Sequence, residues 1–254
     1  MRNNPVLRQV GRISIPILFY VGLLWLAAFL LNEPLQLPYP GTILKAWGEL
    51  AVKKVFWISI AASLWHVFLG LAIGVLCGAV LGLLSHFFPA LSILVRPLLT
   101  VVRSTPVAAI IMLVWRMSGP VYLPVVIAAM MVTPIIADQL TLGLDGADPL
   151  LAEMTSLFGF SRLRAFLTYR LPAALPYFFG AVLTSVGLAW KSGIAAEVIS
   201  AASRSVGREI YFSRLYISEV DTLWAWTLTS IVLSLILEFV VKKTLLFVNK
   251  GRNT

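Results

Sequence analysis

Residues 55–95 read VFWISIAASLWHVFLGLAIGVLCGAVLGLLSHFFPALSILV and contain no Asp, Glu, Lys or Arg. A helix crosses the hydrocarbon core of a bilayer with roughly 20 apolar residues, so this stretch is too long for a single span. Pro89 lacks the amide hydrogen that a helix interior needs, and we expect the first helix to end before it. The stretch therefore predicts a membrane-spanning helix over residues 58–85 and leads into a second one.

The composition extends this conclusion to the whole chain. Of the 254 residues, 59% are hydrophobic and only 12% are charged, and the mean hydropathy is +0.92. Soluble domains carry about 25% charged residues, so the chain is expected to be an all-α polytopic membrane protein. We expect one transmembrane domain over residues 1–254 with about six spans: residues 13–32, 58–85, 94–116, 118–141, 171–198 and 222–246.

The net charge of +9 comes from basic residues near the ends of these spans and not from a continuous basic run. No aromatic-interleaved basic patch accompanies them, so nucleic acid is not an expected partner. Placing the N-terminus inside the cell gathers Arg8, Arg12, Arg164 and Lys243 on the cytoplasmic side, in accord with the positive-inside rule. The sequence therefore predicts a multi-pass membrane protein, surrounded by lipid, with both termini in the cytoplasm.

Chemical motifs are absent from the sequence. The single Cys77 lies in an apolar span, and His66 and His86 lack a metal-ligand spacing. There is no Gly-x-x-x-x-Gly-Lys-Ser/Thr loop for ATP and no nucleophile elbow. We expect no catalytic residue, no metal and no cofactor, and hence no enzyme activity in this chain.

Glycines at positions 70, 74, 78 and 82 form one stripe along the 58–85 span. Small residues at this spacing let a second helix approach closely. Packing inside the bundle is the simpler interpretation, and a moving seam used in gating is the alternative.

Four residues in or beside the spans are candidates for lining a path through the membrane. Arg103 and Pro106 belong to the 94–116 span, while Lys191 and Glu197 lie in AWKSGIAAEVI near the end of the 171–198 span. Ionisable groups within spans face a bundle interior or a watery cavity by default. For Arg103 and Lys191 the alternative is that the side chain reaches out to the lipid headgroups.

A polar, basic island separates the fourth and fifth spans. Residues 148–172 read DPLLAEMTSLFGFSRLRAFLTYRLP. Asp148 is placed to cap a helix that starts at Pro149, and Ser161 is placed to cap a second helix after Gly159. Two short capped helices over residues 147–170, outside the bilayer, predict a surface on which another protein docks.

The spacing within this island resembles the cytoplasmic EAA loop of the membrane subunits of bacterial ABC importers. Glu153, Gly159, Leu171 and Pro172 fall on the matching positions, whereas Met154, Thr155 and Tyr169 depart from the pattern. The resemblance implies a location in the bacterial cytoplasmic membrane and a contact between the loop and a separate ATPase. Leu157 and Phe158 would then insert apolar side chains into a groove of that partner. Glu153 would place a carboxylate at the edge of the groove.

Two further segments are similar to a narrower group, the permeases of nitrate, sulfonate, taurine and bicarbonate importers. These segments are AWKSGIAAEVI and the early Tyr39-Pro40-Gly41-Thr42. The resemblance implies a type I importer fold, a homodimer, an ATPase dimer and an external solute-binding protein. It also implies a small oxyanion or sulfonate-like solute, with a heteroaromatic vitamin precursor as the alternative.

Two other functions compete with this interpretation. A secondary transporter driven by an ion gradient needs midplane carboxylates and usually an internal repeat, and neither is evident. An intramembrane enzyme needs a paired nucleophile and base or a set of metal ligands, and the spans contain none.

Overall fold

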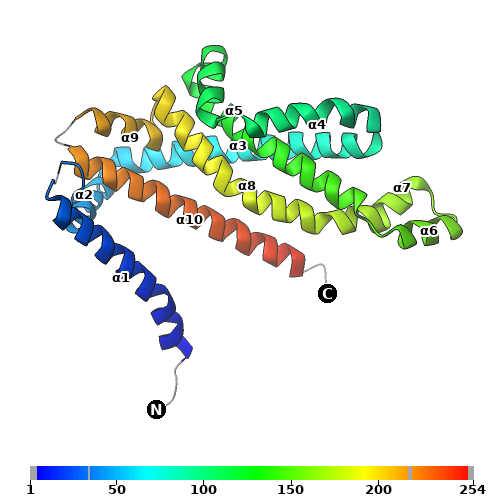
Figure 1. Cartoon of the computed structure of the whole chain (residues 1–254), viewed down its shortest axis with the longest axis horizontal. Coiled ribbons are helices and arrows are strands. Elements are labelled where there is room, and N and C mark those ends of the chain that lie inside the picture. The colour runs from blue at the N-terminus through cyan, green and yellow to red at the C-terminus, as the bar shows by residue number, and fades with distance from the viewer. Residues whose placement is uncertain (1–4, 34, 217–218, 251–254) are drawn as a thin grey trace.

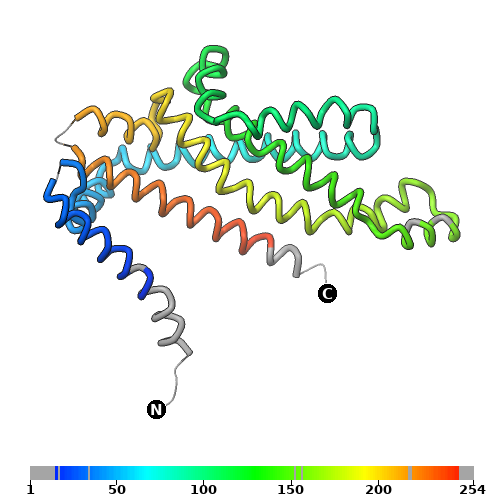
Figure 2. The backbone as a smooth tube through the Cα atoms, viewed as in Figure 1, coloured from blue at the N-terminus to red at the C-terminus, as the bar shows by residue number. Residues whose placement is uncertain are grey.

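The computed structural model is built from helices throughout the residues it describes, which are 5–33, 35–216 and 219–250, without the side chains of 5–14, 17, 152, 156 and 246–250. Figure 1 shows their arrangement, and Figure 2 follows the backbone. The helices are α1 (Pro5–Leu31), α2 (Pro40–Ala51), α3 (Lys54–Phe87), α4 (Pro89–Ser104), α5 (Val107–Asp145), α6 (Pro149–Leu157), α7 (Arg162–Ala165), the π-helix η1 (Phe166–Arg170), α8 (Leu171–Ser200), α9 (Val206–Leu215) and α10 (Val220–Lys250). The cytoplasmic placement predicted for the termini concerns residues 1–4 and 251–254, which lie outside the described residues.

Four helical stretches of the described chain are long and apolar enough to cross a membrane. They are Lys54–Phe87, Val107–Asp145, Arg162–Ser200 and Val220–Leu245, and a shorter apolar stretch covers Leu18–Leu31. The predicted all-helical class is thereby confirmed, and the count of six spans stays a prediction.

The chain from residue 94 to 141 is interrupted at two points. α4 ends before Thr105, which is extended (φ −80°, ψ 133°), and Pro106 then precedes α5. The residue before a proline is disfavoured in the helical region, which explains this break. A second break lies within α5 at Gly119, whose φ of 69° suits glycine far better than other residues. The expected 94–116 span therefore falls on two helices that meet at Thr105 and Pro106.

α5 is the centre of the bundle and makes its most extensive contacts with α3 and α8. Its inward side chains, among them Leu123, Ile127 and Ile136, are fully buried. α10 packs along α8, where the Trp190 indole donates to the Ser230 hydroxyl over 3.2 Å. A membrane protein needs such interhelical contacts because lipid is as apolar as a leucine side chain.

The glycine stripe of α3 packs directly against α5. A Cβ atom built on Gly70 would lie 2.5 Å from the Cβ of Ala128, and one on Gly74 would lie 2.7 Å from that of Val132. Thr141 of α5 donates across the contact to the carbonyl oxygen of Gly82 over 3.1 Å. Helix packing is the role that the structure gives to these glycines.

Candidate functional site

Residues 146–170, here named the α5–α8 connection, project from one end of the bundle (Figure 1). The Asp148 carboxylate accepts from the amide of Leu150 over 2.9 Å at the start of α6. The Ser161 hydroxyl accepts from the amide of Arg164 over 3.3 Å at the start of α7. Both predicted helix caps are therefore confirmed.

Gly159 reverses the chain between these two helices. Its φ of 66° lies in the left-handed region, and no atom lies within 4 Å of the position that a Cβ would take. Conformation and not crowding is therefore what requires glycine here.

The α5–α8 connection exposes several large apolar side chains. Leu157 is 80% exposed and Phe158 is 73% exposed. Leu150, Leu151, Met154 and Leu163 are exposed as well. Glu153 is an exposed residue of the same helix, α6. Several large apolar side chains exposed within one short segment are typical of a protein or membrane contact.

The connection ends in η1, a π-helix that runs directly into α8 at Leu171 and Pro172. Both of these residues are partly buried. Single-turn π-helices are rare and occur often at functional sites.

A polar cluster joins this end of the chain to the bundle, here named the inner cluster: His86, Asp145 and Arg170. His86 Nδ1 lies 2.6 Å from Asp145 Oδ1, and His86 Nε2 lies 3.2 Å from an Arg170 guanidinium nitrogen. Asp145 and Arg170 are the last residues of α5 and η1, and His86 precedes the last residue of α3. Phe87 and Phe166 pack beside them with ring centroids 5.2 Å apart.

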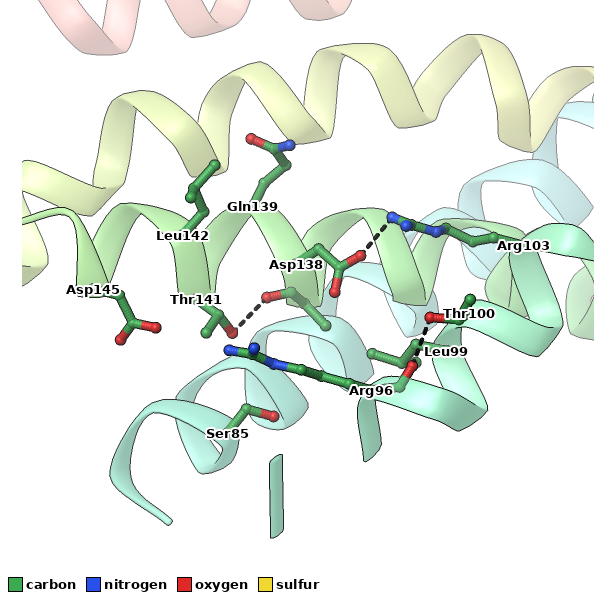
Figure 3. A pocket seen from close by; sticks show the side chains of 11 residues that line it. Ser85, Arg96, Leu99, Thr100, Arg103, Asp138, Gln139, Thr141, Leu142 and Asp145 are labelled. Carbon is green, nitrogen blue, oxygen red and sulfur yellow. Dashed lines mark hydrogen bonds and ion pairs between the residues drawn. The ribbon is translucent and has the colours of Figure 1, made fainter. Parts of the chain in front are cut away.

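A polar cleft of about 430 Å³ opens between α3, α4 and α5 (Figure 3). Its lining includes Ser85, Arg96, Thr100, Arg103, Asp138 and Asp145. In Figure 3 the guanidinium of Arg103 points at the Asp138 carboxylate, and the two form an ion pair between α4 and α5. No ion pair joins Arg96 to a carboxylate among the described residues. Among all the residues that the structure describes, no group of three His, Cys, Asp or Glu side chains is placed to hold a metal ion.

The second polar cluster lies at the opposite end of the bundle and is here named the outer cluster. The Glu197 carboxylate is fully buried and accepts from the Ser63 hydroxyl over 2.7 Å and from the amide of Gly207 over 3.1 Å. His66 Nδ1 lies 2.8 Å from its other oxygen. Ser63 in turn accepts from the amide of Val206, so two residues of α3 and α8 hold the start of α9.

Of the four predicted path residues, the structure brings Arg103 into the cleft and places Pro106 at the break that follows α4. Lys191 is exposed and lies six residues before the buried Glu197 on α8. The four do not form one site, and their contact with a solute stays a prediction.

The sequence profile of the family described as "Binding-protein-dependent transport system inner membrane component" matches residues 70–243. The chain belongs to this family. The match covers the glycine stripe, the cleft and the α5–α8 connection of the permease, and it includes Glu197 and Gly207 of the outer cluster.

Several curated proteins resemble the permease. The taurine transport system permease protein TauC of Escherichia coli (strain K12) is 28% identical over 212 residues, covering 80% of this chain and 76% of that protein. The putative aliphatic sulfonates transport permease protein SsuC of Bacillus subtilis (strain 168) is 26% identical, covering 71% and 65%. The nitrate import permease protein NrtB of Leptolyngbya laminosa is 30% identical, covering 60% and 55%.

A solved structure, described as an amino acid ABC transporter with histidines, superposes on the permease with a TM-score of 0.62. It is 18% identical and covers 78% of this chain and 94% of that one, so the likeness concerns the fold. The predicted function is thereby confirmed: the chain is the permease subunit of an ABC importer, and ATP hydrolysis belongs to a separate subunit. The ion-gradient and enzyme alternatives are set aside.

Sequence reasoning missed the inner cluster and the partners of Glu197. His86 and Asp145 are 59 positions apart, and Ser63 and Glu197 are 134 apart, so no local spacing reveals them. One signal was present: His66 and His86 are polar residues in a charge-free stretch, where a buried hydrogen-bonding group needs a partner.

Proposed function

We propose that the permease works as a homodimer that imports a small anion of the sulfonate or oxyanion class. An external binding protein would deliver the solute, and an ATPase dimer would dock on the α5–α8 connection. The names of the relatives, which are permeases for taurine, aliphatic sulfonates and nitrate, support the solute class.

The single observation that carries the solute class is the polar cleft with its unpaired cation. Arg103 is neutralised by Asp138, whereas Arg96 has no carboxylate partner among the described residues. A guanidinium offers planar, paired donors that match the oxygens of a sulfonate, nitrate or bicarbonate. A path along the cleft would therefore favour an anion.

The apolar surface of α6 supports the ATPase contact. Leu157 and Phe158 stand almost free of the rest of the chain, outside the helices that are apolar enough to span. Binding of ATP would close the ATPase dimer and displace this surface. Differential contacts in the two states would supply the energy for alternating access.

Uptake by cells tests the solute class. Cells that lack the native gene and carry a plasmid copy are offered labelled taurine, ethanesulfonate, nitrate, bicarbonate and a neutral aminopyrimidine. We expect uptake of at least one anion and not of the neutral ring. Arg96→Gln should lower anion uptake about 10- to 100-fold, the value of one charge-assisted contact, and Arg96→Lys should lower it less. Uptake of the aminopyrimidine alone would favour the vitamin-precursor alternative.

Co-purification tests the docking surface. We expect Leu157→Asp and Glu153→Arg to reduce the amount of ATPase that co-purifies with the permease. Leu18→Asn, on the exposed face of α1, is the matched control for a polar change elsewhere. Normal ATPase binding by both loop variants would contradict the docking role.

Cysteine labelling tests the orientation. A cysteine at Ser161 should be shielded from an impermeant reagent in intact cells, and a cysteine at Ser203 should react. Labelling of position 161 from outside would place the α5–α8 connection on the wrong side for an ATPase.

A further inference from the structure

The two ends of the α5–α8 connection meet at one side chain of α3. Asp145 is the last residue of α5, and Arg170 is the last residue of η1. Both contact His86, which lies one residue before the end of α3. The 24 residues between Asp145 and Arg170 therefore form a loop whose two ends are closed by one imidazole.

The partners determine the state of that imidazole. Asp145 is a carboxylate and offers only acceptor oxygens, so His86 Nδ1 carries the hydrogen and donates over 2.6 Å. Arg170 offers only donors, so His86 Nε2 is the acceptor over 3.2 Å. In this arrangement Nδ1 of the ring faces Asp145 and Nε2 faces Arg170, so the one imidazole links the two partners.

The imidazole ring of His86 is buried, whereas the carboxylate of Asp145 is accessible to solvent. The side chain of His86 is 8% exposed, whereas that of Asp145 is 51% exposed. The guanidinium of Arg170 is oriented by a second contact, because its Nε donates to the Tyr169 hydroxyl over 2.9 Å. The ring is therefore fixed relative to α3, while its partners belong to the segments that lead into and out of the connection.

We propose that His86 is a positioning residue that clasps both ends of the α5–α8 connection to α3. The inference rests on the proposed docking of the ATPase on that connection. With the clasp closed, displacement of α6 moves α3 and α5 together. With the clasp open, the ATPase still docks and hydrolyses ATP, but the connection moves without the bundle.

The test uses the complete transporter, in which the permease, its ATPase and its binding protein are reconstituted in proteoliposomes. The measured quantity is the number of labelled solute molecules imported per ATP hydrolysed. We expect His86→Ala and Arg170→Gln each to lower this ratio at least fivefold, with ATPase co-purification within twofold of the unmodified transporter. Cys77→Ala, on an exposed position of α3, is the control and should leave the ratio unchanged.

Two further variants test whether His86 must contact both Asp145 and Arg170 or only one of them. His86→Asn can place its amide NH2 at the position of Nδ1 and keep a donor for Asp145, but the shorter side chain has no atom at the position of Nε2 that faces Arg170. The clasp therefore predicts a ratio as low as that of His86→Ala. In the double variant of His86→Ala with Arg170→Gln, the two effects should not add, because both remove the same contact.

An unchanged ratio in His86→Ala, full recovery by His86→Asn, or additive effects in the double variant would each overturn the clasp. A purely structural role would lower the yield of assembled complex and leave the ratio intact, which also overturns it. Failure of the proposed docking has a different signature, since Leu157→Asp and Glu153→Arg would then retain the ATPase.

Discussion

The outer and inner clusters both rest on a histidine of α3, yet they are built in opposite ways. In the outer cluster the acid, Glu197, is fully buried and meets three partners within 3.1 Å. In the inner cluster the acid, Asp145, has a side chain that is 51% exposed, and among the described residues it bonds to His86 alone. The two histidines are 20 residues apart, about 30 Å along a helix.

The difference indicates which end of the bundle is fixed. A buried carboxylate is stable only with its hydrogen bonds in place, so the outer cluster cannot exchange partners without a large penalty. A hydrated carboxylate exchanges a protein partner for water at little cost. The outer end is therefore a fixed joint between α3, α8 and α9, whereas the inner end can rearrange during a transport cycle.

The largest expected effect comes from breaking the outer cluster. Glu197→Leu leaves the Ser63 hydroxyl, His66 and the Gly207 amide without their acceptor, and the free energy of unfolding should fall by about 3–5 kcal/mol. The measurements are the thermal midpoint and the monodisperse yield of the permease in detergent. Glu197→Gln, which keeps the size and one acceptor oxygen, should lose less. Equal stability of Glu197→Leu and the unmodified permease would show that the outer joint is not fixed.

The next effect concerns the turn at Gly159 on the inner side. Gly159→Val should cost on the order of 1–3 kcal/mol locally, because valine resists a positive φ. The bundle should keep its thermal midpoint, since no atom lies near this position. The ATPase should co-purify less. Gly159→Asn is the control, because asparagine tolerates the left-handed region. A fall in the midpoint of Gly159→Val would contradict the separation of the two ends.

A smaller effect on stability is expected at the ion pair of the cleft. The Arg103 and Asp138 side chains are 49% and 36% exposed, so their contribution to the unfolding free energy is at most about 1 kcal/mol. Arg103→Gln should leave assembly intact and reduce solute uptake. Exchanging the two residues, in Arg103→Asp with Asp138→Arg, should recover part of the uptake. If uptake does not recover, the positive charge at position 103, and not the ion pair, is what uptake requires.

The smallest stability effect is expected at Lys191, which is exposed although its neighbours on α8 are buried. Lys191→Met should change the unfolding free energy by less than about 0.5 kcal/mol. Uptake of an anionic solute should still fall if this side chain borders the path. Unchanged uptake would indicate that Lys191 only reaches toward the headgroups.

Several elements of this structure could be predicted from the sequence because they depend on neighbours in the chain. The caps at Asp148 and Ser161, the turn at Gly159 and the close-packed face of α3 all follow from local spacing. The break at Thr105 and Pro106 also has a local cause, but sequence reasoning expected a continuous span across it.

The clusters could not be predicted because their members come from distant segments. The expected position of Glu197 beside a watery path stays a prediction, but its hydrogen-bond partners, which come from α3 and α9, were not foreseen. The reason lies at Gly207, where a Cβ would lie 2.3 Å from the Cβ of Glu197. Only the folded chain shows that this glycine admits the start of α9 to the carboxylate.

The glycine stripe has a mechanical consequence for the whole permease. Side chains of α5, such as Ala128, Val132 and Ile136, sit in a row of sockets spaced about 6 Å apart along α3. A slip of one residue would drive each methyl group into backbone, so α3 and α5 cannot slide past one another in small steps. The two helices therefore keep a constant position relative to each other along their axes. A displacement of Asp145 would therefore be passed along α3 and α5 toward the end of the bundle that holds the outer cluster.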